Sequence, residues 1–218
     1  MSQNSLEHLL AKNKQWAQRI KDDDPSFFQQ LSSQQKPRYL WIGCADSRVP
    51  CTQLVDLLPG EMFVHRNVAN LVIHTDFNCL SVMQYAIDVL QVEHIIVCGH
   101  YRCGGIQAAL QNQQFGLIDN WLRHVQDVIA KYKNYLDKFV TEQERLDQLC
   151  ELNVSEQVFN VCENTLVRHA WNRGQKLSVH GWIYGVEDGL LRDLSLNVSS
   201  IEEMKSSVHH LFTKTGLI

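Results

Sequence analysis

The chain of 218 residues lacks a basic excess and any long apolar run. Lysine plus arginine total 20 and aspartate plus glutamate total 24, so the formal net charge at pH 7 is −4. This mild acidity disfavours nucleic-acid binding, because nucleic-acid-binding proteins carry a basic patch. No apolar segment approaches the roughly 18 residues that a membrane-spanning helix requires, so we expect no membrane partner.

An apolar leader is also missing, because the first 21 residues are polar and amphipathic. We therefore expect a reducing, cytoplasmic location. In that setting cysteines are more often metal ligands, catalytic groups or buried apolar residues than disulfides. An odd number of cysteines cannot pair completely within one chain. The sequence has seven, which are Cys44, Cys51, Cys79, Cys98, Cys103, Cys150 and Cys162.

Short apolar segments alternate with helical patterns along most of the chain. Three segments predict buried strands, namely residues 39–43, 63–64 and 94–99. Three others have helical spacing, namely residues 76–90, 118–150 and 154–171. Residues 177–184 alternate in polarity, and the turn at 187–189 predicts a hairpin. This order predicts an α/β fold, in which helices flank a mainly parallel central sheet that carries a C-terminal hairpin strand.

Residues 1–34 predict a helical arm that precedes this core. An apolar stripe runs along residues 6–20, and the Asp-Asp-Asp-Pro segment at 22–25 separates it from a second short helix. The stripe has two possible partners, the chain's own core and a second subunit. We expect one domain over residues 1–218, with the α/β core and the C-terminal helices in residues 35–218.

Metal-binding side chains follow two of the predicted strands. Cys44, Asp46 and Arg48 come after the first, and His100 and Cys103 come after the third. In parallel sheets, ligands bind beyond the carboxyl ends of the strands. Zinc takes thiolate and imidazole ligands, so Cys44, His100 and Cys103 can converge on one ion. Three protein ligands leave a fourth position open, which is typical of catalytic zinc.

Asp46 has two alternative roles beside such an ion. As a hydrogen-bond acceptor it orients a zinc hydroxide, whereas as a fourth ligand it displaces the water and switches the site off. Arg48 can hold Asp46 in a bidentate fork and keep it ionised. We therefore hypothesise that the Asp46–Arg48 pair gates the site between an open and a closed state.

The two motifs together resemble the paired signature of the β-class carbonic anhydrases. They are Cys-Ala-Asp-Ser-Arg at 44–48 and Gly-His-Tyr-Arg-Cys-Gly-Gly at 99–105. Similar blocks at 63–70, 81–86 and 180–184 extend the resemblance from the N-terminal helix to about residue 195. The resemblance implies one zinc ion per subunit, held by Cys44, His100 and Cys103, with Asp46 and Arg48 as the catalytic dyad.

The resemblance also implies the residues that contact substrate. Gln35 falls where the family has a glutamine that hydrogen-bonds bound ligands. Phe63, Val68 and Tyr85 match apolar positions of a cleft that lies at a dimer interface in this family. An apolar wall suits CO2, which carries no charge and forms few hydrogen bonds.

A regulatory site is implied by a third set of residues. Trp41, Arg66 and Tyr184 match a trio in a bacterial subgroup that binds bicarbonate at a non-catalytic site and closes. Arg66 can pair with an anion, and Trp41 and Tyr184 offer N–H and O–H donors. We therefore predict allosteric inhibition by bicarbonate.

The expected activity is the reversible hydration of CO2 to bicarbonate and a proton by a homodimer or homotetramer. Zinc hydroxide is the expected nucleophile. Two alternatives remain open: a hydrolase of carbonyl sulfide or carbon disulfide on the same scaffold, and an inert zinc-stabilised module in which Asp46 is a permanent ligand. The role of Tyr101, a bulky residue between two of the ligands, also stays open.

Overall fold

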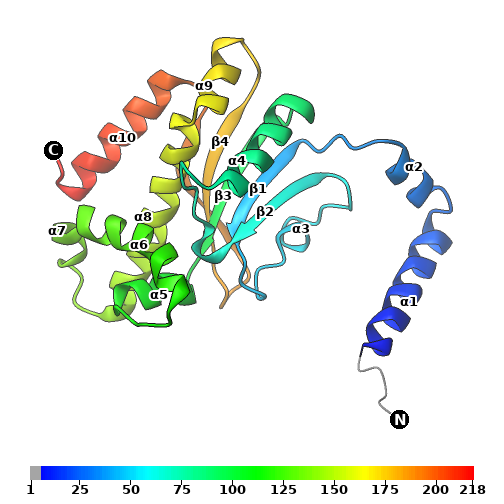
Figure 1. Ribbon diagram of the computed structural model, residues 1–218, viewed down its shortest axis with the longest axis horizontal. Helices are drawn as coiled ribbons and strands as arrows, with labels where there is room; N and C mark the ends of the chain where they lie inside the picture. Colours follow the sequence, from blue (N-terminus) through cyan, green and yellow to red (C-terminus); the bar gives the residue numbers. More distant parts are fainter. Residues whose placement is uncertain (1–5) are drawn as a thin grey trace. The chain divides into compact units, whose positions relative to one another are not determined.

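A five-stranded sheet forms the centre of the fold, and its strands have the order β2-β1-β3-β4-β5. The structure is a computed structural model that describes residues 6–218 (Figure 1). The strands are β1 (Tyr39–Cys44), β2 (Met62–Asn67), β3 (His94–His100), β4 (Ser178–Tyr184) and β5 (Leu191–Val198). The first four are parallel, and β5 pairs antiparallel to β4. The predicted α/β fold, mainly parallel sheet and C-terminal hairpin are thereby confirmed.

The strand order reverses direction between β1 and β3. The chain passes from β1 to β2 on one side and then crosses to β3 on the other side. At such a reversal, an open parallel sheet forms a ligand-binding crevice outside the carboxyl ends of its strands. Cys44 is the last residue of β1 and His100 is the last residue of β3. The topology therefore brings the two motifs to one place.

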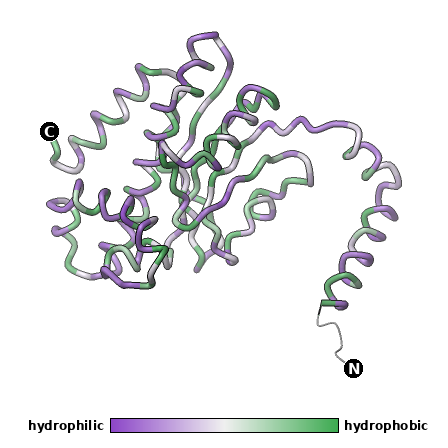
Figure 2. The backbone as a smooth tube through the Cα atoms, in the orientation of Figure 1, coloured by the Kyte–Doolittle hydropathy of each residue, from purple (hydrophilic) through white to green (hydrophobic). Residues whose placement is uncertain are grey.

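The larger core lies on one face of the sheet. Leu40, Ile42, Ile95 and Val97 point into it and are fully buried. Three helices and a π-helical turn pack against this face, namely α4 (Phe77–Gln84), the turn at Tyr85–Val89, α8 (Glu142–Glu163) and α9 (Thr165–Asn172). The tube is hydrophobic along β1 and β3 in Figure 2. Each such aliphatic side chain contributes about 1.5–3 kcal/mol when it is buried fully.

The opposite face carries a smaller cluster around Trp41. Ile96, Cys98 and Tyr184 pack with Trp41 beneath the chain that leads into α3 (Cys51–Leu54). Gly43 allows the indole to lie flat on the strand, because a Cβ there would come within 2.3 Å of Trp41 Nε1. This face of the sheet is therefore also apolar at β1 and β3, as expected for a parallel sheet.

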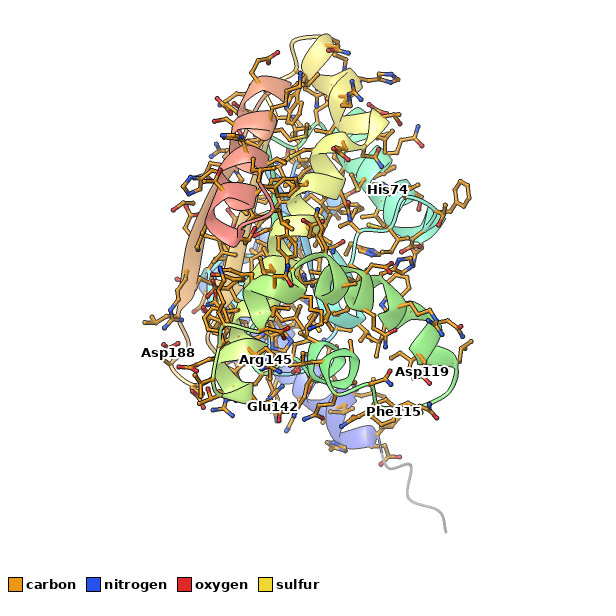
Figure 3. The ribbon with its side chains drawn as sticks, turned by 90° about the vertical axis from the view of Figure 1, so that its left-hand side faces the viewer. His74, Phe115, Asp119, Glu142, Arg145 and Asp188 are labelled. Carbon is orange, nitrogen blue, oxygen red and sulfur yellow. The ribbon has the colours of Figure 1, made fainter. Side chains whose placement is uncertain are left out.

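The helices after β3 differ in their bounds from the predicted 118–150 and 154–171. They are α5 (Gly104–Leu110), α6 (Leu117–Lys131), α7 (Lys133–Leu136), α8, α9 and, after β5, α10 (Ile201–Thr215). Caps set these bounds. The Asp119 carboxylate accepts from the backbone N–H groups of Phe115 and Gly116 at the start of α6 (Figure 3). Thr141 and Glu144 form a capping box that starts α8.

The described residues fall into two units, which divide between Lys36 and Pro37. In the first, Trp16 of α1 (Glu7–Asp23) packs edge-to-face on Phe28 of α2 (Phe27–Ser33), with ring centroids 5.7 Å apart. Leu6, Leu9 and Leu10 of the apolar stripe are exposed. Residues 1–5 of the predicted arm lie outside the described residues. Between residues 6 and 218, no helix combines the length and the apolar character needed to cross a membrane.

Candidate metal centre

Three buried side chains converge at the carboxyl ends of β1 and β3. The ligand atoms of Cys44, His100 and Cys103 all lie within 4.8 Å of one another, and the two sulfurs are 3.9 Å apart. His100 Nδ1 donates to the Tyr101 carbonyl oxygen at 2.9 Å, so the ring carries its hydrogen there. Nε2 therefore presents a lone pair, and this buried atom has no hydrogen-bond partner. A lone pair beside two thiols fits zinc.

The Cys44 and Cys103 side chains share a hydrogen bond that favours the thiolate form of Cys44. This bond lowers the pKa of Cys44 to about 4, and the same bond with burial raises the pKa of Cys103 well above its ordinary value. The nearby backbone N–H groups of Ala69 and Asp46 also help to lower the pKa of Cys44. One proton thus remains between the sulfurs, and a cation that binds both sulfurs replaces it.

Asp46 lies beside this cluster and is held by Arg48. Arg48 Nε donates to Oδ1 at 2.9 Å and Nη2 donates to Oδ2 at 2.7 Å, which is the bidentate fork expected from the sequence. These bonds lower the pKa of Asp46 far below its usual range. Oδ2 lies 3.7 Å from His100 Nε2. An ionised carboxylate is therefore fixed next to the ligand atoms.

Tyr101 points away from the ligand atoms and anchors the turn that carries them. Its hydroxyl donates to Glu151 Oε1 of α8 at 2.7 Å. Burial, and then the bond to Glu151, raise the pKa of Tyr101 above its ordinary value. The question left open by the sequence is answered here, because the hydroxyl of Tyr101 is engaged by α8.

Comparison with known proteins agrees with this geometry. The family model described as carbonic anhydrase matches residues 39–191. A carbonic anhydrase of Emericella nidulans is 42% identical over 193 residues, which are 88% of this chain and 85% of that protein. The chain belongs to the β-class carbonic anhydrase family. The solved structure of the Coccomyxa β-carbonic anhydrase in complex with acetazolamide has a TM-score of 0.90 and 39% identity, and the match covers 97% of this chain and 98% of that one.

A second solved structure extends the comparison to a described assembly. It belongs to a pair of tetrameric β-carbonic anhydrases from Sordaria macrospora, with a TM-score of 0.85 and 36% identity. The match covers 90% of this chain and 100% of that chain. The predicted membership of the β-carbonic anhydrases is thereby confirmed, whereas the bacterial bicarbonate-regulated subgroup stays a prediction.

The residues expected to line the carbonic anhydrase cleft lie in three places. Val68 directly follows β2 and packs against the apolar cluster that includes Cys44 and Cys103. Phe63 and Tyr85 contact each other, with ring centroids 5.8 Å apart. Phe63 lies four positions before the residue that pairs with Cys44, about 13 Å along the strand. The structure therefore does not bring this pair to the ligands of the same chain. Gln35 belongs to the first unit and stays a prediction.

The predicted regulatory trio is divided between two environments. Trp41 and Tyr184 are buried in one cluster, with 1% and 7% of their surface exposed. Arg66 donates from Nε to the Cys44 carbonyl at 2.8 Å and from Nη2 to the Asp46 carbonyl at 2.5 Å. Arg66 therefore holds the backbone of the loop that carries Cys44 and Asp46, a role that the sequence analysis missed.

The remaining cysteines show no ligand geometry. All seven cysteines are free and buried. Burial raises the pKa of Cys79, Cys98, Cys150 and Cys162 above the ordinary thiol value. These four thiols are therefore packing residues in their protonated form.

Proposed function

We propose that the chain catalyses the reversible hydration of CO2 to bicarbonate and a proton, with one zinc ion per subunit. The observation that carries this proposal is the unpartnered, buried Nε2 of His100 between two thiols and an ionised aspartate. Cys44, His100 and Cys103 hold the zinc. When bound, zinc supplies Lewis acidity that generates a nucleophile from water near neutral pH.

Asp46 acts as the hydrogen-bond acceptor that orients this nucleophile toward CO2. Both Asp46 oxygens accept hydrogen bonds from Arg48. Asp46 must therefore break this bidentate, charge-assisted contact before it can become a fourth zinc ligand. The contact supports the open arrangement of the gate. Arg48 also keeps Asp46 ionised, and an ionised carboxylate accepts hydrogen bonds without competing for the proton that leaves the site.

The apolar pair Phe63–Tyr85 lines the active-site cleft of a neighbouring subunit. Tyr85 is 44% exposed, and Val89, at the end of the same π-helical turn, is 60% exposed. Together with the tetrameric relative from Sordaria macrospora, this exposed surface supports a homodimer or homotetramer whose cleft takes Phe63 and Tyr85 from one subunit and the metal ligands from the other. Gln35 would join the same cleft.

Trp41, Arg66 and Tyr184 form the proposed bicarbonate site. An anion that takes the Arg66 guanidinium away from the Cys44 and Asp46 carbonyls would release the loop on which both residues stand. We expect inhibition by bicarbonate that steepens at lower pH and is lost in Trp41→Phe and Tyr184→Phe. Tyr39→Phe, a change on the same face of β1, is the control. Simple hyperbolic inhibition in all variants contradicts this regulation.

A substrate comparison tests the proposed activity. Stopped-flow assays of the zinc-loaded protein with CO2 and with carbonyl sulfide should show hydration of CO2 at the higher kcat/KM. A preference for carbonyl sulfide identifies the alternative hydrolase. Zinc-replete protein that turns over neither substrate identifies the inert module. The single domain over residues 1–218 and the cytoplasmic location remain part of the proposal, and limited proteolysis and cell fractionation test them.

A further inference from the structure

The segment that follows β2 is held by side chains along its backbone. Residues 68–72, here called the 68–72 turn, include the short 3-10 helix Val68–Asn70. Asn67 bonds to both the N–H and the carbonyl of Leu71, at 2.8 and 2.7 Å. Side chains of distant helices bind the other backbone groups of the turn. From α6, Trp121 Nε1 donates to the Val68 carbonyl at 2.8 Å. From α8, Asn153 Nδ2 donates to the Ala69 carbonyl at 2.9 Å, Asn160 Nδ2 donates to the Val72 carbonyl at 3.0 Å, and Gln157 Oε1 accepts from the Val72 N–H at 2.8 Å.

The turn has a backbone conformation that its own residues do not favour. Ala69 has φ 66° and Asn70 has φ 48°, both in the left-handed region. Alanine adopts this region only when the surrounding structure imposes it. The bonds from Trp121, Asn153, Gln157 and Asn160 are therefore the contacts that maintain the turn.

The turn lies against both ligand-bearing segments. The Ala69 N–H lies close enough to the Cys44 sulfur to help lower the pKa of that thiol, and Ala45, the residue after Cys44, donates from N to the Asn67 carbonyl at 2.8 Å. On the other side the turn packs on Gly105, where a Cβ would come within 2.8 Å of Val68 Cγ1. A displacement of the turn would therefore alter the surroundings of Cys44 and Cys103 together.

Three amides on one face of α8 supply most of the distant bonds. Asn153, Gln157 and Asn160 are spaced by four and three residues, so they share a helix face. They also bond to one another in series, Gln157 Nε2 to Asn153 Oδ1 and Asn160 Nδ2 to Gln157 Oε1, each at 3.1 Å. Asn153 and Gln157 are only 1% and 2% exposed. Buried amides are costly unless bonded, and here the bonds end on the turn.

We propose that Asn153, Gln157 and Asn160 are positioning residues of the metal centre, which hold the 68–72 turn so that the Ala69 N–H faces the Cys44 sulfur and Val68 stays beside Gly105. This inference rests on the proposed zinc site. An N–H donor withdraws negative charge from a thiolate ligand. Without it the sulfur donates more strongly, and its charge transfer to a bound metal moves to lower energy. Outer partners of this kind alter metal affinity by about 10–100-fold.

The test uses cobalt(II) as a spectroscopic probe and zinc affinity as a second readout. Asn153→Leu keeps the side-chain size and removes the bond to Ala69. We expect its sulfur-to-cobalt band at longer wavelength than in the unmodified protein, because the sulfur then donates more strongly. We also expect a zinc Kd raised about tenfold in competition with a chelator, because the released turn no longer holds the ligand atoms in position and this loss outweighs the stronger donation. Asn160→Leu, at a half-buried position, should show smaller changes in the same direction. If Asn153→Leu does not fold, the Asn160→Leu variant still tests the proposal.

Val161→Ala is the matched control, because Val161 is fully buried on α8 in the apolar core and bonds to no part of the turn. It should lower the melting temperature while the cobalt band and the zinc Kd stay unchanged. Folded asparagine variants with an unchanged band and Kd overturn the positioning role, and so does an equal shift in Val161→Ala. If the unmodified protein shows no sulfur-to-cobalt band, the proposed metal site itself fails, and the positioning role fails with it.

Discussion

Arg48 joins the two ligand-bearing loops through the backbone of Arg102. Its Nη2 donates to the Arg102 carbonyl oxygen at 3.2 Å and to Asp46 Oδ2 at 2.7 Å. Arg102 itself has φ 57° and stands directly before Cys103. One guanidinium therefore sets the position of the Asp46 carboxylate relative to the turn between His100 and Cys103.

Replacing Arg48 should reduce activity without removing the metal. Arg48→Lys keeps the charge but loses the planar fork, so Asp46 is no longer held at both oxygens. We expect kcat/KM for CO2 hydration to fall about 10–100-fold, with zinc content unchanged by elemental analysis. Arg102→Ala is the control, because it removes only the exposed pair with Glu187. An unchanged kcat/KM in Arg48→Lys would show that the role of Asp46 does not depend on the two hydrogen bonds from Arg48.

Loss of a ligand should release the metal. Cys103→Ser and His100→Gln each leave two of three ligands, and we expect purified protein to retain less than about a tenth of the zinc after dialysis against a chelator. Cys162→Ala removes another buried thiol, far along α8 in the apolar core, and should retain zinc. Full zinc occupancy in Cys103→Ser would place the metal elsewhere.

Tyr101 should matter for stability and not for the reaction. Tyr101→Phe removes the hydrogen bond to Glu151, and a bond to a carboxylate contributes about 1.5–3 kcal/mol. Because the hydroxyl faces α8, we expect a lower free energy of unfolding and an unchanged pH profile of kcat. Urea unfolding and a pH–rate series measure the two effects. A shifted pH profile would show that the hydroxyl contacts the reacting groups.

His65 should make stability depend on pH in mildly acidic solution. Its side chain is 7% exposed, and burial lowers its pKa below the ordinary value of 6.5. A lowered histidine pKa means that the unfolded chain binds the proton more readily. The stabilisation is therefore complete above about pH 6.5 and is lost as the pH falls below that value.

The difference between the protein and His65→Asn isolates this effect. The free energy of unfolding of the unmodified protein should fall more steeply than that of His65→Asn between about pH 6.5 and 5. His74→Asn, at an exposed position, should run parallel to the unmodified protein. Parallel curves for the protein and His65→Asn would contradict the inferred pKa shift.

The core of the site was predictable from the sequence because it depends on rules of topology. Cys44 and His100 end two apolar strands, and parallel strands that end at one edge bring such residues together. The fork between Asp46 and Arg48 lies within one short loop, so spacing alone indicates it. For the same reason the hairpin of β4 and β5 followed from local alternation and a turn.

Other features were not predictable because they depend on contacts between distant segments. The bounds of α6 and α8 are set by caps at Asp119 and Thr141, which periodicity does not register. Arg66 binds backbone carbonyls of a neighbouring strand, and no pattern in its own segment indicates them. The amides of α8 did leave a signal, a polar i, i+4, i+7 spacing among the apolar residues in the second half of the helix, but their target, the 68–72 turn, becomes visible only in the fold.

If zinc at Cys44, His100 and Cys103 drives CO2 hydration, the activity depends on both the ion and its ligands. Stopped-flow CO2 hydration should be recorded between about pH 7 and 9 for metal-free protein before and after addition of one equivalent of zinc, with Cys103→Ser in parallel. We expect activity that appears with zinc in the unmodified protein and stays absent in Cys103→Ser. Zinc-loaded protein that is inactive at every pH, or an equally active Cys103→Ser, would contradict it.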